Sequence, residues 1–409
     1  MENNRASFGS NFGFLMAAIG SAVGLGNIWG FPYKMGMSGG FAFLLVYLVL
    51  AVLVGLAVMV GEFTIGRKTG MSPVAAYRKL SKKFTWMGYM AVLVPFLVLC
   101  FYFVLGGMVM RYALGYLTAI FGWDTWNVAD ISEFFGQFIL NGGQMILWTA
   151  IFIALNAFIV AAGVAEGIEK FCKIGMPALF IMLLIVIVYV AVQPGAMDGY
   201  KFMFGWNVEP LKEDFLKVLK TAAGQMFFSL SLGMGAMITY GSYLGKQEHL
   251  QRNAFIVCGA DTLIALMAGM AVMPACSAFG VEYGAGPGLL FASMQTVFSH
   301  MGSVGNLIGF LFYLLVLIAA LPAGADFGDY SGDSDFGGSS DWSSSDSSWD
   351  SSDWDSDSYA DSSDGGTLGL SFWVIGIILM VAFVTTNVGG KKTVSYTHLR
   401  AHETRRNLV

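Results

Sequence analysis

The chain has 409 residues, of which 56% are hydrophobic and 12% are charged, and its mean hydropathy is +0.66. Because an ordinary water-soluble domain is about one quarter charged, this composition excludes a water-soluble globule and the soluble enzyme classes. The sequence contains no phosphate loop, catalytic-triad pattern or metal-binding cluster. It therefore predicts a protein of the lipid bilayer that is not an enzyme and has no resident cofactor and no nucleic-acid partner.

Apolar runs long enough to cross about 30 Å of hydrocarbon recur along the whole chain. They predict membrane-spanning helices over residues 10–32, 40–65, 84–118, 145–163, 174–193, 216–244, 253–279 and 304–323. Glycine and polar residues interrupt the first and the sixth of these. A further apolar run at residues 367–386 brings the expected number of spans to about nine.

Basic residues gather in alternate loops, as in residues 67–83, which carry two arginines and four lysines, or in Lys170 and Lys173. The positive-inside rule places these loops and the N-terminal residues 1–9 in the cytoplasm. The net charge of −5 hides this pattern, because Asp326–Asp364 holds 12 of the 27 acidic residues and no Lys or Arg. We expect a multi-pass protein of the plasma membrane with a cytoplasmic N-terminus.

The C-terminal part of the chain changes character after residue 323. Residues 324–366 consist mainly of Asp, Ser, Gly and Trp without an apolar period, a composition typical of disorder. The Asp spacing lacks the Glu that closes an EF-hand calcium loop. Residues 387–409 match no membrane pattern and have the character of a non-native tail.

The two interrupted helices carry the strongest functional signal. The first contains GSAVGLGNIWG, in which Ser21 and Asn27 stand among four glycines, and the sixth contains GQMFFSLSLGMGAM, with Ser229–Gly235 at its centre. Backbone that unwinds in a membrane must find hydrogen-bond partners inside the protein. Glycines that serve only close helix packing are the alternative explanation. Two such segments in corresponding positions indicate a transporter built from inverted repeats, with its site at the midplane.

The motifs GSAVGLGNIWGFPY, GEFTIGR, GIEK, GQMFFSLSLGMGAMITYGSY and GPGLLF make the chain resemble the neurotransmitter:sodium symporter family over about residues 5–321. The resemblance implies an all-α integral membrane protein with a LeuT-type inverted-repeat fold. Helices 1–5 (residues 10–193) form the first repeat, and an outer loop with helices 6–8 (residues 194–323) forms an incomplete second repeat. It also implies import of an amino acid together with Na⁺ by alternating access.

The resemblance assigns a first sodium site, which the substrate carboxylate completes. Its ligands are Ala22, Asn27, Ser229 and Asp261. Many relatives have Asn at the position of Asp261 and need chloride to balance the sodium charge. Since an ionisable residue in an apolar span is a functional candidate by default, a fixed carboxylate here implies chloride-independent transport. Tyr47 and Gln225 match positions around the chloride of those relatives, and Glu62 matches a buried acid near the break in helix 6.

The same resemblance assigns a substrate site. The family's carboxylate and ammonium ligands match Ala22, Leu25, Gly26, Tyr102, Phe228, Ser229 and Ser231, and its side-chain pocket matches Val98, Phe228 and Met234. Met234 replaces a rigid aromatic residue found in many relatives. Because methionine adapts to irregular shapes, it favours a large apolar or aromatic amino acid.

The gates and the second sodium site depart from the family pattern. Arg5 matches the cytoplasmic gate, but Gly30 replaces the outer-gate arginine, so Phe228 alone is expected to cover the substrate from outside. Backbone carbonyls of Gly20, Val23 and Ala319 match the second sodium site. Pro322 and Ala323 stand where relatives supply its two hydroxyl ligands.

Helices 9 and 10 of the family are not recognisable after residue 323, which suggests a truncated or chimeric reading frame. The alternative to a symporter is therefore a family member that binds substrate and does not transport it. An amino-acid carrier of the same architecture driven by protons, or without sodium, is a third hypothesis, against which Asn27, Ser229 and Asp261 argue. The transported amino acid, the sodium stoichiometry and the oligomeric state stay open at this level.

Overall fold

The computed structural model describes residues 10–123, 131–161, 168–245, 247–283, 290–291 and 294–329. The chain divides into two compact units, Met1–Tyr330 and Ser331–Val409, and every described residue belongs to the first. The expected cytoplasmic residues 1–9 with Arg5, the acidic segment beyond residue 329, the apolar run 367–386 and the tail 387–409 lie outside the described residues.

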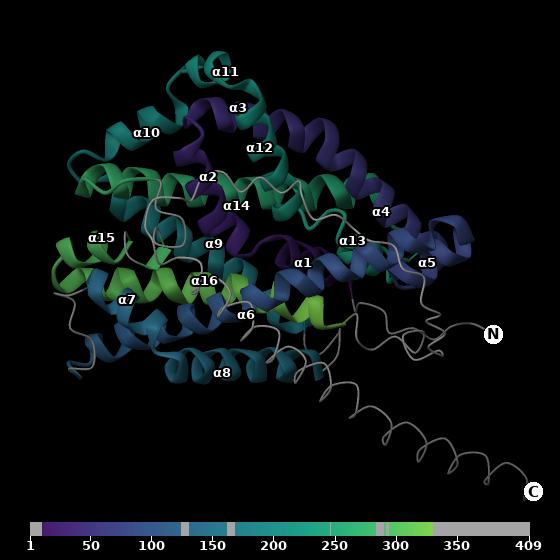
Figure 1. The fold of residues 1–409 in the computed structure, drawn as a ribbon, viewed down its shortest axis with the longest axis horizontal. Helices are drawn as coiled ribbons and strands as arrows, with labels where there is room; N and C mark the ends of the chain where they lie inside the picture. The colour runs from purple at the N-terminus through teal and green to yellow at the C-terminus, as the bar shows by residue number, and fades with distance from the viewer. Residues whose placement is uncertain are drawn as a thin grey trace, which may run out of the picture. The chain divides into compact units, whose positions relative to one another are not determined.

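Helices make up almost all of the described chain (Figure 1). Their bounds are α1 Asn11–Ala22, η1 Gly26–Gly30, α2 Phe31–Met37, α3 Phe41–Leu50, η2 Ala51–Gly55, α4 Leu56–Thr69, α5 Pro73–Leu80, η3 Lys82–Phe84, α6 Thr85–Ile120, α7 Ile131–Leu140, α8 Gly142–Ala161, α9 Lys170–Ala191, α10 Ala196–Phe204, α11 Glu209–Glu213, α12 Phe215–Ser229, α13 Ala236–Ser242, α14 Leu250–Phe279, α15 Met294–His300 and α16 Ser303–Asp329. Six continuous helices of the described part are long and apolar enough to cross a membrane, and α1 with η1 and α2 forms a seventh, bent span. The all-α membrane fold expected from the sequence is confirmed.

The first span is interrupted gently. α1 begins at the cap Ser10, whose Oγ accepts a hydrogen bond from the Gly13 N–H at 3.0 Å, and it ends at Ala22. The chain then continues as the π-helical turn η1 and as α2, with a bend of 50° between the two halves. Apart from the Ile19 carbonyl, which accepts from the Val23 N–H at 2.7 Å, the last carbonyl groups of α1 lack the donors of a following helical turn and are available to other partners.

The sixth expected span is broken more sharply. α12 begins at the cap Asp214, whose Oδ1 accepts from the Lys217 N–H at 2.9 Å, and it ends at Ser229. Residues 230–235 form turns, and α13 starts after Gly235. Ser231, Gly233 and Gly235 have φ angles of 52°, 76° and 74°. This left-handed backbone cannot continue a right-handed helix, which explains the break.

α14 lies in the middle of the unit and contacts α1, α2, α4, α9 and α10, while α6, α8 and α16 pack on one another (Figure 1). Small residues allow the closest crossings. A Cβ on Gly66 of α4 would lie 2.0 Å from the Ile238 carbonyl oxygen of α13, and a Cβ on Gly241 of α13 would lie 2.7 Å from the Phe63 carbonyl oxygen of α4. Glycine is therefore required on both helices at this crossing.

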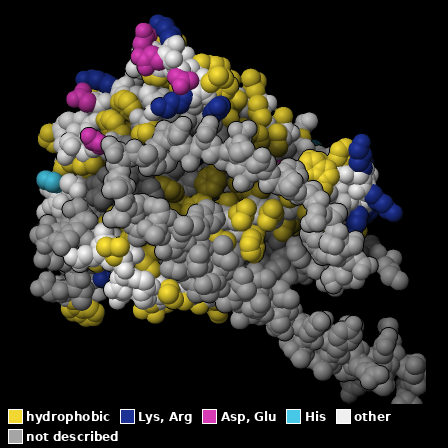
Figure 2. All heavy atoms as spheres, in the orientation of Figure 1, with side chains coloured by type: hydrophobic (Ala, Val, Ile, Leu, Met, Phe, Trp, Pro, Cys, Tyr) yellow, Lys and Arg dark blue, Asp and Glu magenta, His cyan; other side chains and the backbone are white. Residues whose placement is uncertain are grey.

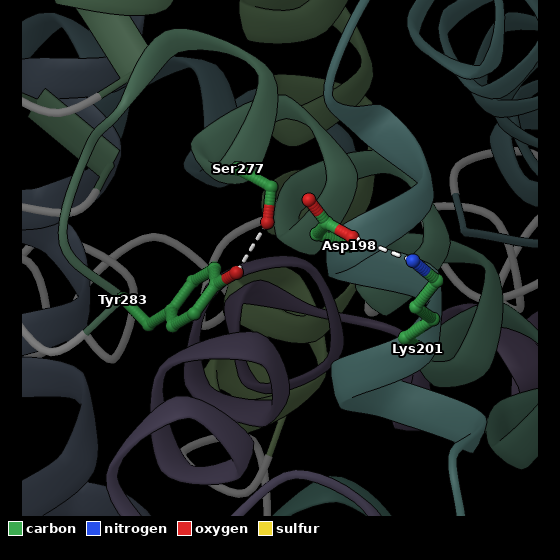
Figure 3. Close-up of polar contacts among 4 residues, drawn as sticks. All are labelled: Asp198, Lys201, Ser277 and Tyr283. Atoms are coloured by element: carbon green, nitrogen blue, oxygen red, sulfur yellow. Dashed lines mark hydrogen bonds and ion pairs between the residues drawn. The ribbon is translucent and has the colours of Figure 1, made fainter.

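Short helices occupy segments that the sequence analysis treated as loops. α10 and α11 lie within residues 194–215 and α15 lies near residue 300, where ordered outer loops were expected. Tyr283 joins two of these regions: its ring stacks on Phe202 of α10 at 4.7 Å between centroids, and its hydroxyl hydrogen-bonds Ser277 at the end of α14 (Figure 3). In the same close-up, Asp198 and Lys201 of α10 form an ion pair at 2.9 Å.

Charged side chains mark different parts of the visible face (Figure 2). Lys and Arg side chains without acidic neighbours gather around α5, whereas charges of both signs gather over α10 and α11, with hydrophobic side chains between the two groups. α5 lies at one end of the unit, and α7, α10 and α15 lie at the opposite end (Figure 1). The long helices run between these ends.

α16 continues to Asp329 and so passes the expected helix end at residue 323. Pro322 and Ala323 thus belong to a helix, although their side chains are outside the described part. α16 thus extends six residues beyond the expected boundary between the last span of the second repeat and the acidic segment. The cause is plain, because small residues and one proline after residue 321 give no apolar period to extend.

Candidate transport site

Asp261 of α14 joins the two helix breaks. Its Oδ1 accepts a hydrogen bond from Asn27 Nδ2 of η1 at 2.7 Å, and its Oδ2 accepts from Ser229 Oγ at the end of α12 at 2.8 Å. The Asn27 amide also donates to the Asp261 backbone carbonyl at 3.1 Å. All three side chains are buried, and Asp261 is 0% exposed. Three residues far apart in the chain thus form one oxygen-rich cluster.

The donor set suits a hard monovalent cation. It combines a carboxylate, an amide oxygen and a hydroxyl, and the carbonyl of Ala22 at the end of α1 is the fourth expected oxygen. In the described part of the chain, no group of three or more His, Cys, Asp or Glu side chains could hold a metal ion. A single negative charge among neutral oxygens matches the unwound-helix Na⁺ sites of transporters, whereas softer metals prefer nitrogen and sulfur ligands.

Gln225 connects the two breaks a second time. Its Nε2 donates to the Gly26 carbonyl oxygen at 2.8 Å, while its buried Oε1 has no hydrogen-bond partner among the described residues. The hydroxyl of Tyr47 on α3 is buried in the same region and interacts with Asp261 and Ser229. A Cβ on Gly30 would lie 3.3 Å from the Gln225 Oε1, so the end of η1 packs directly against this amide.

Glu62 of α4 holds the unwound segment after α12. Its Oε1 accepts a hydrogen bond from the Gly233 N–H at 2.7 Å, and its Oε2 is buried with no hydrogen-bond partner in the described part of the chain. Unwound backbone in a membrane must be satisfied inside the protein, and here a carboxylate from another helix does so. The expectation that Glu62 lies near the break in helix 6 is confirmed.

The residues expected at the substrate site lie beside this oxygen-rich cluster. The Leu25 N–H points to the Tyr102 hydroxyl of α6 at 3.5 Å, and the Ser231 hydroxyl donates to the Ser21 carbonyl at 3.4 Å. A Cβ on Gly26 would lie 2.9 Å from the Phe228 ring. The unwound parts of both helices and the middle of α6 therefore meet in one place.

Met234 and Val98, two of the expected pocket residues, differ in burial. Met234 is buried in the segment after α12. Val98 lies one helical turn before Tyr102 on α6 and is partly exposed. Of the second sodium set, Gly20 and Val23 are buried on α1, and Ala319 is buried on α16, which contacts α1. The expected helix pair is therefore present, while Arg5 lies outside the described residues.

Lys34 of α2 is a site residue that sequence reasoning missed. Its Nζ lies 5.7 Å from the centroid of the Phe228 ring. The two positions are far apart in the chain, so no local pattern predicts the contact. A lysine inside an apolar span is nevertheless a signal on its own, because such residues are rare and functional by default.

Comparisons with known proteins agree with this geometry. The model of the sodium:neurotransmitter symporter family matches residues 5–137 and 127–328. An uncharacterized sodium-dependent transporter of Bacillus subtilis, YhdH, is 36% identical over 324 residues, which are 79% of this chain and 70% of the relative. One from Haemophilus influenzae is 34% identical over 334 residues, covering 78% of this chain and 71% of the relative. The crystal structure of MhsT in complex with L-phenylalanine superposes with a TM-score of 0.76 and 34% identity, covering 96% of this chain and 83% of MhsT.

The fold, with its two broken helices and an oxygen cluster between them, defines a sodium-dependent secondary transporter of the membrane, not an enzyme. The chain belongs to the sodium:neurotransmitter symporter family. The family resemblance and the LeuT-type fold expected from the sequence motifs are thereby confirmed.

Proposed function

We propose that this protein imports an amino acid together with Na⁺ across the plasma membrane by alternating access, with its N-terminus in the cytoplasm. The observation that carries the proposal is the buried Asp261 cluster, which ties Asn27 and Ser229 of the two breaks together. Na⁺ bound there would take the place of the Asn27 amide and the Ser229 hydroxyl as the partner of the Asp261 carboxylate. A substrate carboxylate at the Leu25 and Gly26 amides, near Tyr102, would complete the ion's coordination and couple the two ligands.

The substrate proposed is a large apolar or aromatic amino acid. Met234 and Phe228, with Val98 on α6, offer apolar surface next to the polar backbone of the breaks. Ala22, Ser229 and Ser231 would hold the ammonium group. MhsT, the structural relative, is in complex with L-phenylalanine, and this similarity supports L-phenylalanine as the first ligand to test.

Transport is proposed to be chloride-independent, because Asp261 already supplies a fixed negative charge beside the cation. The side chains of Tyr47 and Gln225 lie in the same region, which is where chloride-dependent relatives are expected to hold their anion. The charge of Asp261 makes a second anion there electrostatically unfavourable.

Uptake of radiolabelled L-phenylalanine into proteoliposomes tests the proposal. With an inward Na⁺ gradient, wild-type protein should accumulate the amino acid above its equilibrium level, and replacing chloride by gluconate should leave the rate unchanged. Lack of accumulation with any of the twenty amino acids would contradict symport, while a collapse in gluconate would contradict only chloride independence. Asp198→Asn is the matched control for Asp261→Asn, since Asp198 is an exposed carboxylate far from the cluster.

Binding without transport is the second candidate, and the sequence of α16 favours it. Pro322 and Ala323 bring no hydroxyl groups to the proposed second sodium set of Gly20, Val23 and Ala319. In this case, the reconstituted protein would bind L-phenylalanine in the presence of Na⁺ and would not accumulate it. The same proteoliposomes, assayed for binding and for uptake, separate the two functions.

A further inference from the structure

We infer that Lys34 forms an outer recognition point for the substrate's carboxylate, which the incoming amino acid meets before it passes Phe228. The inference rests on the proposed function and adds to it a residue that controls entry. It assigns to Lys34 a role in the selection of anion-bearing ligands.

The arrangement of α2 and α12 provides the first argument. One part of the Phe228 ring lies against Gly26, where a Cβ would be 2.9 Å from ring carbons. The Lys34 Nζ lies 5.7 Å from the centroid of the same ring. The Phe228 ring is therefore close both to Gly26, whose amide is proposed to hold the substrate carboxylate, and to the ammonium group of Lys34.

The unused charge of Lys34 provides the second argument. Lys34 is partly buried, and within the described residues its ammonium makes no hydrogen bond and no ion pair. A partly desolvated charge without a partner is costly, and the contact with the Phe228 ring compensates for it only in part. An anion supplied by a ligand would remove this cost.

Three acidic residues of α10, α11 and the start of α12 are engaged on their own helices, and Glu213 and Glu282 are exposed. Asp198 pairs with Lys201 at 2.9 Å, Glu209 pairs with Lys212 at 2.8 Å, and Asp214 caps α12. Figure 3 shows the first of these pairs beside the Tyr283–Ser277 contact. A Cβ on Gly36 would lie 2.6 Å from the Tyr283 Cβ, so Tyr283 packs against α2 two residues beyond Lys34.

The kinetics of L-phenylalanine binding to the full chain in nanodiscs, at fixed Na⁺ concentration, test the inference. Lys34→Gln should slow association about fivefold, in the range of a partly exposed charge pair, and leave dissociation unchanged. Lys34→Arg should keep the wild-type rate, since it keeps the charge. Lys201→Gln removes the same charge at the same end of the unit and should change nothing.

A second ligand separates charge recognition from packing against Phe228. N-acetyl-L-phenylalanine keeps the carboxylate and lacks the ammonium, so it should compete at the outer point in wild type and fail to compete in Lys34→Gln. An unchanged association rate in Lys34→Gln, or equal slowing in Lys34→Gln and Lys34→Arg, would overturn the inference. If wild type shows no Na⁺-dependent binding of any amino acid, the proposed function itself fails.

Discussion

The two helix breaks are alike in sequence and differ in backbone. The first, from Ala22 to Gly30, bends by 50° and passes through a π-helical turn with no left-handed residue. The second uses three left-handed residues, Ser231, Gly233 and Gly235. Glycine therefore has two different roles. In the first break it allows Phe228 and Gln225 to approach the backbone closely, and in the second it allows the backbone to turn.

The breaks also differ in how their backbone is satisfied. Gln225 and Asn27, two neutral amides, serve the first, with Gln225 bonded to the Gly26 carbonyl and the Asn27 Oδ1 accepting from the Gly24 N–H at 3.2 Å. A carboxylate, Glu62, serves the second. Asp261 accepts hydrogen bonds from a residue of each break, Asn27 and Ser229, so its loss should affect both breaks at once.

Asp261→Ala should have the largest effect. It removes the acceptor of Asn27 and of Ser229 and the only charge of the proposed sodium site, and hydrogen bonds to charged groups contribute about 1.5–3 kcal/mol each. We expect Na⁺-dependent binding of L-phenylalanine to weaken by more than ~100-fold, measured by titration with NaCl. Asp198→Ala is the control. A change below about threefold would show that the cluster does not hold the coupling ion.

Gly235→Ala should come next, because two costs combine at this residue. The new Cβ would lie 2.6 Å from Pro73 Cγ, and φ is 74°. Overpacking costs about 1–3 kcal/mol and left-handed backbone roughly 1–2 kcal/mol. The free energy of unfolding in detergent should fall by their sum, and adding Pro73→Ala should restore only the steric part. Complete restoration would contradict a conformational role for this glycine.

Gly26→Ala tests the opposite role in the first break. Its Cβ would press on the Phe228 ring without backbone strain, so binding of L-phenylalanine should weaken about tenfold, or about 1.4 kcal/mol. Adding Phe228→Leu should relieve part of this loss, when compared with Phe228→Leu alone. No coupling between the two changes in a double-mutant cycle would mean that close approach is not the reason for this glycine.

Gly233→Ala should have the smallest effect on substrate binding. Its φ is 76° and no atom lies within 4 Å of the new Cβ, so only strain of roughly 1–2 kcal/mol is expected. Gly70→Ala is the matched control, since Gly70 has a φ of 63°, open space, and a place outside the break. Equal losses of thermal stability in the two variants are the expected result. A much larger loss of binding in Gly233→Ala would show that the strain reaches the site.

The sequence predicted the long helices and the two breaks because hydrophobic length and clustered glycines are local signals. It also placed Asp261 and Glu62, through motif resemblance. It did not predict α10 or α11, which are short and whose bounds depend on contacts with other elements. The sequence also did not predict the contact of Lys34 with Phe228 or the two kinds of break. Both depend on packing between residues distant in the chain.

The glycine crossing of α4 and α13 has a practical consequence for spectroscopy. With Gly66 and Gly241 leaving no space between the helices, any shift of α13 carries α4 with it. Gly61, on the exposed side of α4, has open space around its missing Cβ, and the four native cysteines are buried. A single cysteine at residue 61 would therefore accept a spin label or fluorophore and report on α13, most of whose own residues are buried.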